Sequence, residues 1–133
     1  MIDPENAVYT VIRNAVKENF RDATVSGVLE LLPSDFPAVF IEMSDCYPYR
    51  QGADGDEIEN FCVAVFEVNI FANTTNTRKA QAKSIQRTVD AAFNRLGFQR
   101  TMCMPVNGND ATRYRLVSRY EAVVSKDLVI YRR

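Results

Sequence analysis

Three arginines, Arg113, Arg115 and Arg119, follow one another at two- and four-residue steps in the stretch TRYRLVSRYEAVVS (residues 112–125). Alternate residues of a β-strand point to the same face, so a strand here places the three guanidinium groups together and the two tyrosines on the other face. Guanidinium groups bind phosphates and carboxylates through paired hydrogen bonds. The strip can therefore bind a nucleic-acid backbone, an anionic substrate or acids of another subunit, or lie partly exposed on a sheet face.

A second set of cations falls on one face of a helix that the sequence predicts within residues 73–97. Its members are Arg78, Lys79, Lys83 and Arg87. Positive charge without fixed base contacts binds nucleic acid regardless of its sequence. With Arg113 and Arg115 on the same surface, the chain would be a sequence-nonspecific DNA-binding module. No glycine-rich phosphate loop or RNA-binding aromatic motif accompanies these residues, and a solvated helix face is the alternative.

Four acids are clustered in the stretch GADGDEIEN: Asp54, Asp56, Glu57 and Glu59. Carboxylate oxygens are ligands for divalent cations, but the repeated Asp/Asn spacing and the distal glutamate of a calcium-binding loop are missing. We therefore expect no metal here. We interpret the cluster as part of a solvated loop, or as the partner of basic residues on another copy of the chain.

The residue types argue against catalysis. The sequence has no histidine, which removes the commonest general base and metal ligand. Its three cysteines, Cys46, Cys62 and Cys103, are odd in number and widely spaced, as expected for reduced thiols of a protein made in the cytosol. We expect neither an enzyme nor a cofactor.

Charge is divided unevenly along a chain of otherwise ordinary globular composition. Hydrophobic residues make up 47% and charged residues 25% of the 133 residues, which predicts one domain over residues 1–133. Residues 1–67 contain 4 Lys/Arg and 13 Asp/Glu, a net charge of −9, whereas residues 68–133 contain 12 and 4, a net charge of +8. The division indicates a nucleic-acid surface or complementary contacts between copies, unless the two halves interleave in the fold.

Apolar periodicity predicts two helices that position these charges. Residues 3–20 carry apolar side chains at three- and four-residue steps, with Asp3 as the N-cap and Pro4 at the first helical position. Residues 73–97 show the same periodicity, with residues 75–77 as caps and Gly97 as the C-terminal stop.

Two strands are expected in the middle of the chain, one starting near Val39 and a long one starting at Phe61. Between them, residues 45–60 are rich in glycine and acids and predict a long exposed acidic loop. The long strand begins with apolar residues on both faces, and Phe61, Val63 and Val65 share one of them. That face needs a covering layer, either from the chain's own helices or from another subunit.

The last strands are expected to form a meander whose register follows from matching faces. A five-residue loop over residues 107–111 brings apolar residues of two strands opposite each other. The pairs are Phe98–Tyr120, Met102–Leu116 and Met104–Tyr114. A tight return at residues 125–127 adds a short final strand. Its pairs are Val124–Leu128 and Ala122–Ile130.

The predicted fold is α+β, in the order α-β-β-α-β-β-β, with a mostly antiparallel sheet and two main helices packed on one face of it. The densest apolar run, at residues 61–72, contains a glutamate and an asparagine and is too short to cross a bilayer. No secretory signal opens the sequence, so we expect no membrane association.

Four sequence elements occur in order along residues 36–133: VNIFAN in a strand, LGF at the end of a helix, PVNGND in a strand and loop, and an ending with YRLVSRYEAVV and VIYR. Together they resemble the small tail terminator and head–tail connector (neck) proteins of long-tailed bacteriophages. The N-terminal helix agrees with that family in type. No single residue carries the resemblance, which depends on the ordered set.

The resemblance implies a non-catalytic structural virion protein with helices on a mostly antiparallel sheet. It implies a homo-oligomeric ring, a hexamer, that caps the tail tube protein and docks it to the head connector or stopper protein, with DNA passing through the lumen. Its place would be the head–tail junction, after synthesis in the host bacterial cytoplasm. A head-side neck or minor capsid protein of the same fold is the alternative. The two basic sets, the acidic cluster and the three apolar residues at 61, 63 and 65 are then subunit-interface or lumen candidates.

Overall fold

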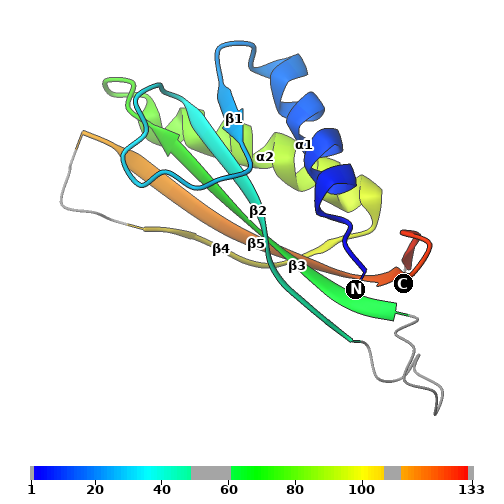
Figure 1. The fold of residues 1–133 in the computed structure, drawn as a ribbon. Helices are drawn as coiled ribbons and strands as arrows, with labels where there is room; N and C mark the ends of the chain where they lie inside the picture. The colour runs from blue at the N-terminus through cyan, green and yellow to red at the C-terminus, as the bar shows by residue number, and fades with distance from the viewer. Residues whose placement is uncertain (1, 49–60, 107–111, 132–133) are drawn as a thin grey trace.

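The computed structural model describes residues 2–48, 61–106 and 112–131 as two helices and a mostly antiparallel sheet (Figure 1). The elements are α1 (Glu5–Asn19), β1 (Thr24–Ser26), β2 (Ala38–Pro48), β3 (Phe61–Ala72), α2 (Arg78–Leu96), β4 (Gln99–Pro105), β5 (Tyr114–Ser125) and β6 (Ile130–Tyr131). The six-stranded sheet has the order β1-β2-β3-β5-β4, and β6 pairs with β5. Only β1 and β2 run parallel among these pairs. The predicted α+β fold and element order are confirmed, with β1 as an additional short strand.

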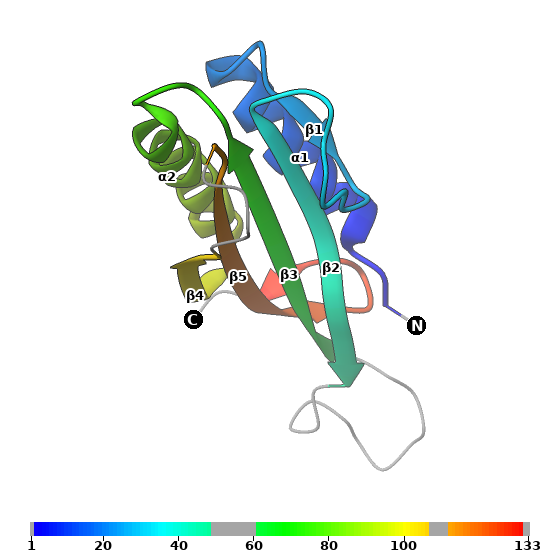
Figure 2. The same ribbon diagram turned by 90° about the vertical axis from the view of Figure 1, so that its left-hand side faces the viewer.

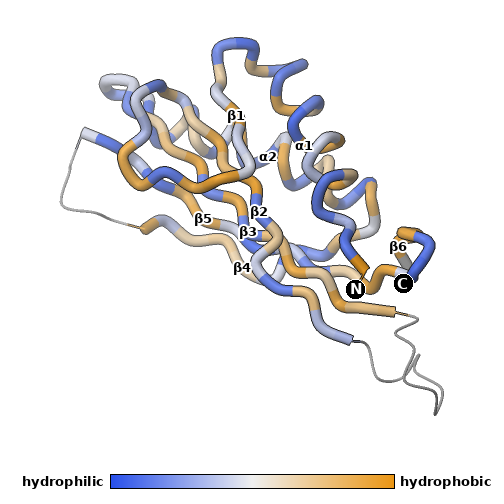
Figure 3. Tube along the Cα trace, viewed as in Figure 1, coloured by the Kyte–Doolittle hydropathy of each residue, from blue (hydrophilic) through white to orange (hydrophobic). Residues whose placement is uncertain are grey.

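Both helices cover the same face of the sheet, as the view turned by 90° also shows (Figure 2). Helix α1 packs on β1 and β2, α2 packs on β3, β4 and β5, and the helices contact each other. Figure 3 shows hydrophobic residues alternating with hydrophilic ones along the helices and concentrated in the central strands. The result is two layers with one open sheet face, which we call the open face.

Helix α1 forms because its apolar residues recur at one-turn intervals. Val8, Ile12 and Val16 are buried against the sheet. The N-cap is Pro4 rather than the expected Asp3, whose Oδ1 accepts a hydrogen bond at 3.1 Å from the N–H of Glu5, the first helical residue. Glu5 in turn ties the helix to the sheet by accepting a 2.9 Å hydrogen bond from the Met43 N–H of β2.

Helix α2 ends at Gly97, as predicted. Gly97 has φ of 101°, a left-handed conformation, and its N–H donates to the carbonyl of Asn94 at 3.0 Å while the Phe98 N–H donates to that of Phe93 at 3.0 Å. This pair of bonds is a Schellman motif. At the other end the N-cap is Thr77, within the expected residues 75–77, although its side chain makes no capping hydrogen bond.

We expect Gly97→Ala to lower the free energy of unfolding by about 1 kcal/mol, because a Cβ is disfavoured at this positive φ. Urea denaturation followed by circular dichroism measures the change. Gly27→Ala is the matched control, since a Cβ there would meet its nearest atoms at an ordinary 3.8 Å. Equal losses in the two variants would contradict the role of Gly97 as the C-cap.

An aromatic cluster fills the core between α2 and the sheet. Phe93 stacks on Tyr120 with ring centroids 4.2 Å apart and lies 5.3 Å from Phe98 and 5.9 Å from Phe66. All four rings are at most 2% exposed. Phe93 is therefore the centre of the core, in contact with both β3 and β5.

A second, smaller cluster lies on the open face. Ala38, Phe40 and Phe71 are buried there beneath Leu29 and Phe36 of the segment that precedes β2. The Glu42 carboxylate fastens the same segment by accepting a hydrogen bond from the Leu29 N–H. The open face is thus covered at one end, and no helix of the described residues covers its remaining part.

Three sequence expectations about strands are wrong. Residues 45–48 belong to β2 rather than to the expected loop, whose remaining residues 49–60 lie outside the described residues. Strand β4 pairs three residues further along β5 than expected, so that Met102 lies opposite Arg119 and Met104 opposite Val117. A bulge between Arg100 and Met102 contributes one residue of this shift.

The register of β6 also differs, by two residues, because Ser125 closes a longer turn. The Leu128 N–H donates to the Ser125 carbonyl at 2.9 Å, and the Val129 N–H donates to Ser125 Oγ at 3.1 Å. Val124 consequently lies opposite Ile130 rather than opposite Leu128. A shift of two residues leaves every side chain on its expected face.

Candidate functional site

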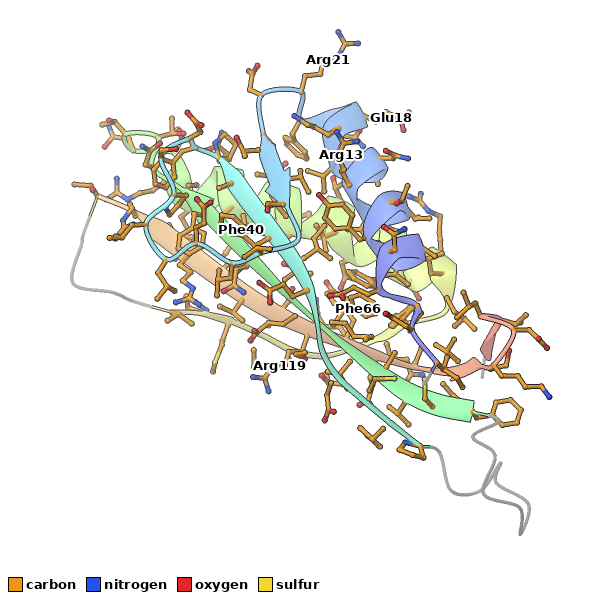
Figure 4. All side chains as sticks on the ribbon, viewed as in Figure 1. Arg13, Glu18, Arg21, Phe40, Phe66 and Arg119 are labelled. Atoms are coloured by element: carbon orange, nitrogen blue, oxygen red, sulfur yellow. The ribbon has the colours of Figure 1, made fainter. Side chains whose placement is uncertain are left out.

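The three arginines of the opening stretch lie on or beside the open face. Ser118 and Tyr120 of β5 hydrogen-bond to Gln86 of α2, so even-numbered β5 residues face the helices and odd-numbered ones face away. Figure 4 shows Arg119 on the side of the sheet away from the helices, with Phe66 on the helix side. The prediction that the tyrosines and arginines occupy opposite faces of β5 agrees with this arrangement.

Arg115 is bound within its own chain. Its Nε and Nη2 both donate to Oδ1 of Asn69 on β3, at 3.0 and 2.7 Å. Its guanidinium also lies over the ring of Phe71, 5.4 Å from the centroid. The half-buried Arg115 therefore stabilises the sheet at the edge of the smaller open-face cluster and has little freedom to bind another molecule.

Arg119 and Arg113 contact groups of the same chain as well. Arg119 pairs with Glu67 directly across β3 at 3.4 Å, with its side chain 50% exposed. Such an exposed pair stabilises a fold by at most about 1 kcal/mol. Arg113 Nη1 donates to the Leu31 carbonyl at 3.2 Å. The acidic partner of Arg119 is therefore Glu67 of the same subunit, which could not be identified from the sequence alone.

Apolar residues form a strip on the uncovered part of the open face. We call it the open strip and define it as Tyr47, Phe61, Val63, Val65 and Val123. Val63 lies between Tyr47 of β2 and Val123 of β5, which are its cross-strand partners. Tyr47 is 44% exposed, and the three β3 residues are half-buried. An apolar strip of this kind in a sheet centre is typical of an interface with another molecule.

Sequence reasoning missed a buried polar network beneath α2. Gln86 Nε2 donates to the Tyr120 hydroxyl at 2.7 Å, Ser118 donates to Gln86 Oε1 at 3.1 Å, and Tyr120 donates to Asp90 Oδ1 at 3.1 Å. Burial is the main cause that raises the pKa of the Tyr120 hydroxyl far above its ordinary value of 10.0. The one feature of the sequence that indicates such a network is Gln86, a polar residue on the apolar stripe of α2.

Removing the Tyr120 hydroxyl is expected to lower the free energy of unfolding and to make that free energy less dependent on pH above pH 10. Tyr120→Phe should lower the free energy of unfolding by about 1–2 kcal/mol at pH 8, because Gln86 and Asp90 each lose a partner. The raised pKa means that the neutral hydroxyl favours folding fully below pH 10, and that this contribution is lost as the pH rises further. Urea unfolding at pH 8 and above pH 10 should show a steeper loss for the natural protein than for Tyr120→Phe. Equal slopes would contradict this account.

The cations of α2 border a groove on the helix side of the sheet. This basic groove has a volume of about 370 Å³ and is lined by Lys79, Lys83, Gln86, Arg87, Cys103, Pro105, Tyr114 and Leu116. Its three cations are exposed, whereas Tyr114 is half-buried and Leu116 is buried. No carboxylate is among these lining residues. Arg78 begins α2 but does not line the groove.

The two basic sets do not form a single surface. Lys79, Lys83 and Arg87 lie on the helix side, whereas Arg115 and Arg119 lie on the open face. The single basic surface assumed by the DNA-binding alternative, with Lys79 and Lys83 beside Arg115, is therefore not formed by the described residues. The reason is that α2 packs on the face of β5 opposite to the arginines.

The remaining site predictions lack a described counterpart. Asp54, Asp56, Glu57 and Glu59 lie outside the described residues. Within residues 2–48, 61–106 and 112–131, no three His, Cys, Asp or Glu side chains gather closely enough to hold a metal ion. Neither described helix has the length and apolar character needed to span a membrane.

Neither a protein-family model nor a curated protein sequence matches the chain. A function is therefore assigned from the surfaces of the structure. The described structure offers two surfaces for that purpose. One is the open strip, and the other is the basic groove between α2 and the edge strand β4. The apolar residues of the first and the exposed cations of the second suit contacts with another macromolecule.

Proposed function

We propose that this chain is a structural protein of a bacteriophage tail, a tail terminator that forms a ring on the tail tube and joins it to the head connector. The ordered resemblance over residues 36–133 supports the class of protein. The α+β fold with both helices on one face of the sheet agrees with what that resemblance implies. The ring itself is supported by how charge is arranged across the fold.

The strand order keeps the acidic and basic halves of the chain apart, and this observation carries the proposal. Helix α1 with β1 and β2 forms one edge of the sheet, α2 with β4 and β5 forms the other, and β3 lies between them. Residues 2–48 carry eight Asp/Glu and three Lys/Arg, whereas the described residues from 68 to 131 carry ten Lys/Arg and three Asp/Glu. One edge is therefore acidic and the opposite edge basic.

Opposite charge at opposite edges suits a head-to-tail contact between copies. In a cyclic ring each subunit offers one patch to its neighbour on one side and a different patch to its neighbour on the other. Contacts between like edges would bring like charges together, which disfavours a two-fold symmetric dimer through these edges. The open strip adds apolar area that can be buried between copies, which the charged edges do not provide.

Two measurements test the proposal. Size-exclusion chromatography with light scattering at several protein concentrations should give a mass several times that of the 15.1 kDa chain. Electron microscopy of tails assembled without the protein should show tubes of uncontrolled length, and adding it should restore a uniform length. A monomer at every concentration, also with tail tubes present, would overturn the proposal. Finished tails that fail only to join heads would instead indicate the head-side neck protein.

A further inference from the structure

We propose that the basic groove binds the acidic segment of residues 49–60 from a neighbouring copy of the chain. The inference rests on the proposed ring and names the partner of its basic edge. Three observations lead to it. The groove carries positive charge without a counterpart, and it has an apolar floor. The segment is too short to fill the groove of its own copy.

The positive charge of the groove has no counterpart in the part of the chain that the structure describes. Lys79, Lys83 and Arg87 are all exposed, and none of their side chains forms an ion pair or hydrogen bond with a described residue. The other basic side chains nearby are engaged, since Arg100 pairs with Asp90 at 3.4 Å. A ligand with several negative charges would therefore match the charge of this groove.

The floor of the groove favours a peptide over a phosphate backbone. Pro105 and the half-buried Tyr114, with the buried Leu116, line the groove beside the cations as apolar residues. A nucleic-acid backbone would use the cations and leave this surface uncovered. The segment of residues 49–60 carries four carboxylates against one arginine and has Ile58 among the acids. It therefore matches both the charge and the apolar surface.

Chain length prevents the segment from reaching the far end of the groove, at Leu116, in its own copy. The segment connects Pro48 of β2 to Phe61 of β3, and Phe61 pairs with Ser125. The groove residue Leu116 pairs with Ile70, nine residues further along β3, which is about 30 Å at 3.3 Å per residue. Twelve residues tied at both ends extend outward by only about 20 Å. The segment can thus fill the groove of another copy but not its own.

The segment and the groove lie at different places on each copy, as head-to-tail contacts in a ring require. The segment leaves one end of the sheet, and the groove lies toward the other end on the basic edge. A copy that gives its segment to one neighbour leaves its own groove open for the segment of the other neighbour. Each contact is then head-to-tail, which is the kind of contact that builds a ring when the rotation between copies closes.

A disulfide trap tests the contact directly, because Cys103 is an exposed thiol that lines the groove. Full-length Glu57→Cys is oxidised with copper–phenanthroline at mildly alkaline pH, since partial desolvation raises the pKa of the Cys103 thiol. We expect a ladder of covalent multimers on a non-reducing gel. The ladder should vanish in Glu57→Cys/Cys103→Ser and be absent from the natural protein. No ladder, a ladder that persists without Cys103, or a bond within one chain would each overturn the inference.

A charge exchange tests the same contact without covalent chemistry. Lys79→Glu/Lys83→Glu/Arg87→Glu and Asp54→Lys/Asp56→Lys/Glu57→Lys should each weaken self-association at least tenfold. Both triple changes in one chain should restore association to within threefold of the natural protein. Lys79→Arg/Lys83→Arg/Arg87→Lys is the control, with three substitutions at the same positions that keep the positive charge, and should stay within threefold of the natural protein. Failure of the combined chain to associate while circular dichroism shows it folded would overturn the inference.

Peptide binding separates this inference from the ring. A fluorescent peptide of residues 49–60 should bind the dilute protein, with at least tenfold weaker binding when its four acids are amidated or when the groove is reversed. Binding to a protein that stays monomeric would uphold the groove contact and refute the ring. Rings by light scattering with no peptide binding and no disulfide ladder would refute the contact alone. Duplex DNA that binds the groove in place of the peptide would assign it to nucleic acid instead.

Discussion

Phe93→Ala is expected to lower the free energy of unfolding by about 3–5 kcal/mol, as the loss of a fully buried aromatic side chain does. Phe93 is fully buried, stacks on Tyr120 and contacts Phe66 and Phe98. Its removal leaves a cavity at the point where α2, β3 and β5 meet, and three aromatic rings cannot close it without leaving their own contacts. Urea denaturation at pH 7 measures the loss.

The matched control is Phe61→Ala, the same substitution on the open face. Phe61 is half-buried at the start of β3 and has no aromatic partner among the described residues. We expect it to lower the free energy of unfolding of the monomer by about 1 kcal/mol, since it removes little buried surface. Similar losses in the two variants would mean that the aromatic cluster is not the centre of the core.

The fold could be predicted from the sequence where one face of an element is buried. Ile12 and Val16 fix the buried side of α1, and Gly97 fixes the end of α2. Strand β4 lacks such a constraint, because six of its seven residues are exposed and only Met102 is half-buried. A strand that is exposed on both faces does not specify its register by hydrophobic pattern. The pairing of Met102 and Met104 with the core was therefore predicted wrongly.

The partners of the arginines could not be predicted, because the β3–β5 pairing joins strands that are far apart in the sequence. The polar residues Glu67 and Asn69 interrupt the apolar pattern of β3 at a spacing of two, which marks them as members of one face. Only the register shows that they lie beside Arg119 and Arg115. No local turn sets this register, so the sequence contains the residues but not their pairing.

The basic groove depends on the same long-range pairing. Periodicity places Lys79, Lys83 and Arg87 on one face of α2, and this part of the prediction agrees with the structure. The groove exists because β4 at the sheet edge brings Cys103 and Pro105 beside that face. The cations could thus be identified from the sequence, whereas their apolar neighbours could not.

Val63→Glu is the substitution expected to affect assembly most strongly. Val63 lies in the middle of the open strip, with Tyr47 and Val123 as its cross-strand neighbours. In the monomer its side chain is half-buried, so a glutamate can reach water and should lower the free energy of unfolding by only about 1 kcal/mol. In an assembly that covers the strip, the same carboxylate would be buried without a partner.

That burial costs about 3 kcal/mol or more, which corresponds to at least a 100-fold weaker association between copies. Light scattering across a concentration series should show the loss, and circular dichroism should show a folded monomer. Val11→Glu is the control, because Val11 is 43% exposed on α1 and lies away from the sheet. If Val63→Glu associates as the natural protein does, subunits meet through their charged edges alone. If Val11→Glu has the stronger effect, the interface lies over α1, and the open strip faces the tail tube or the head connector.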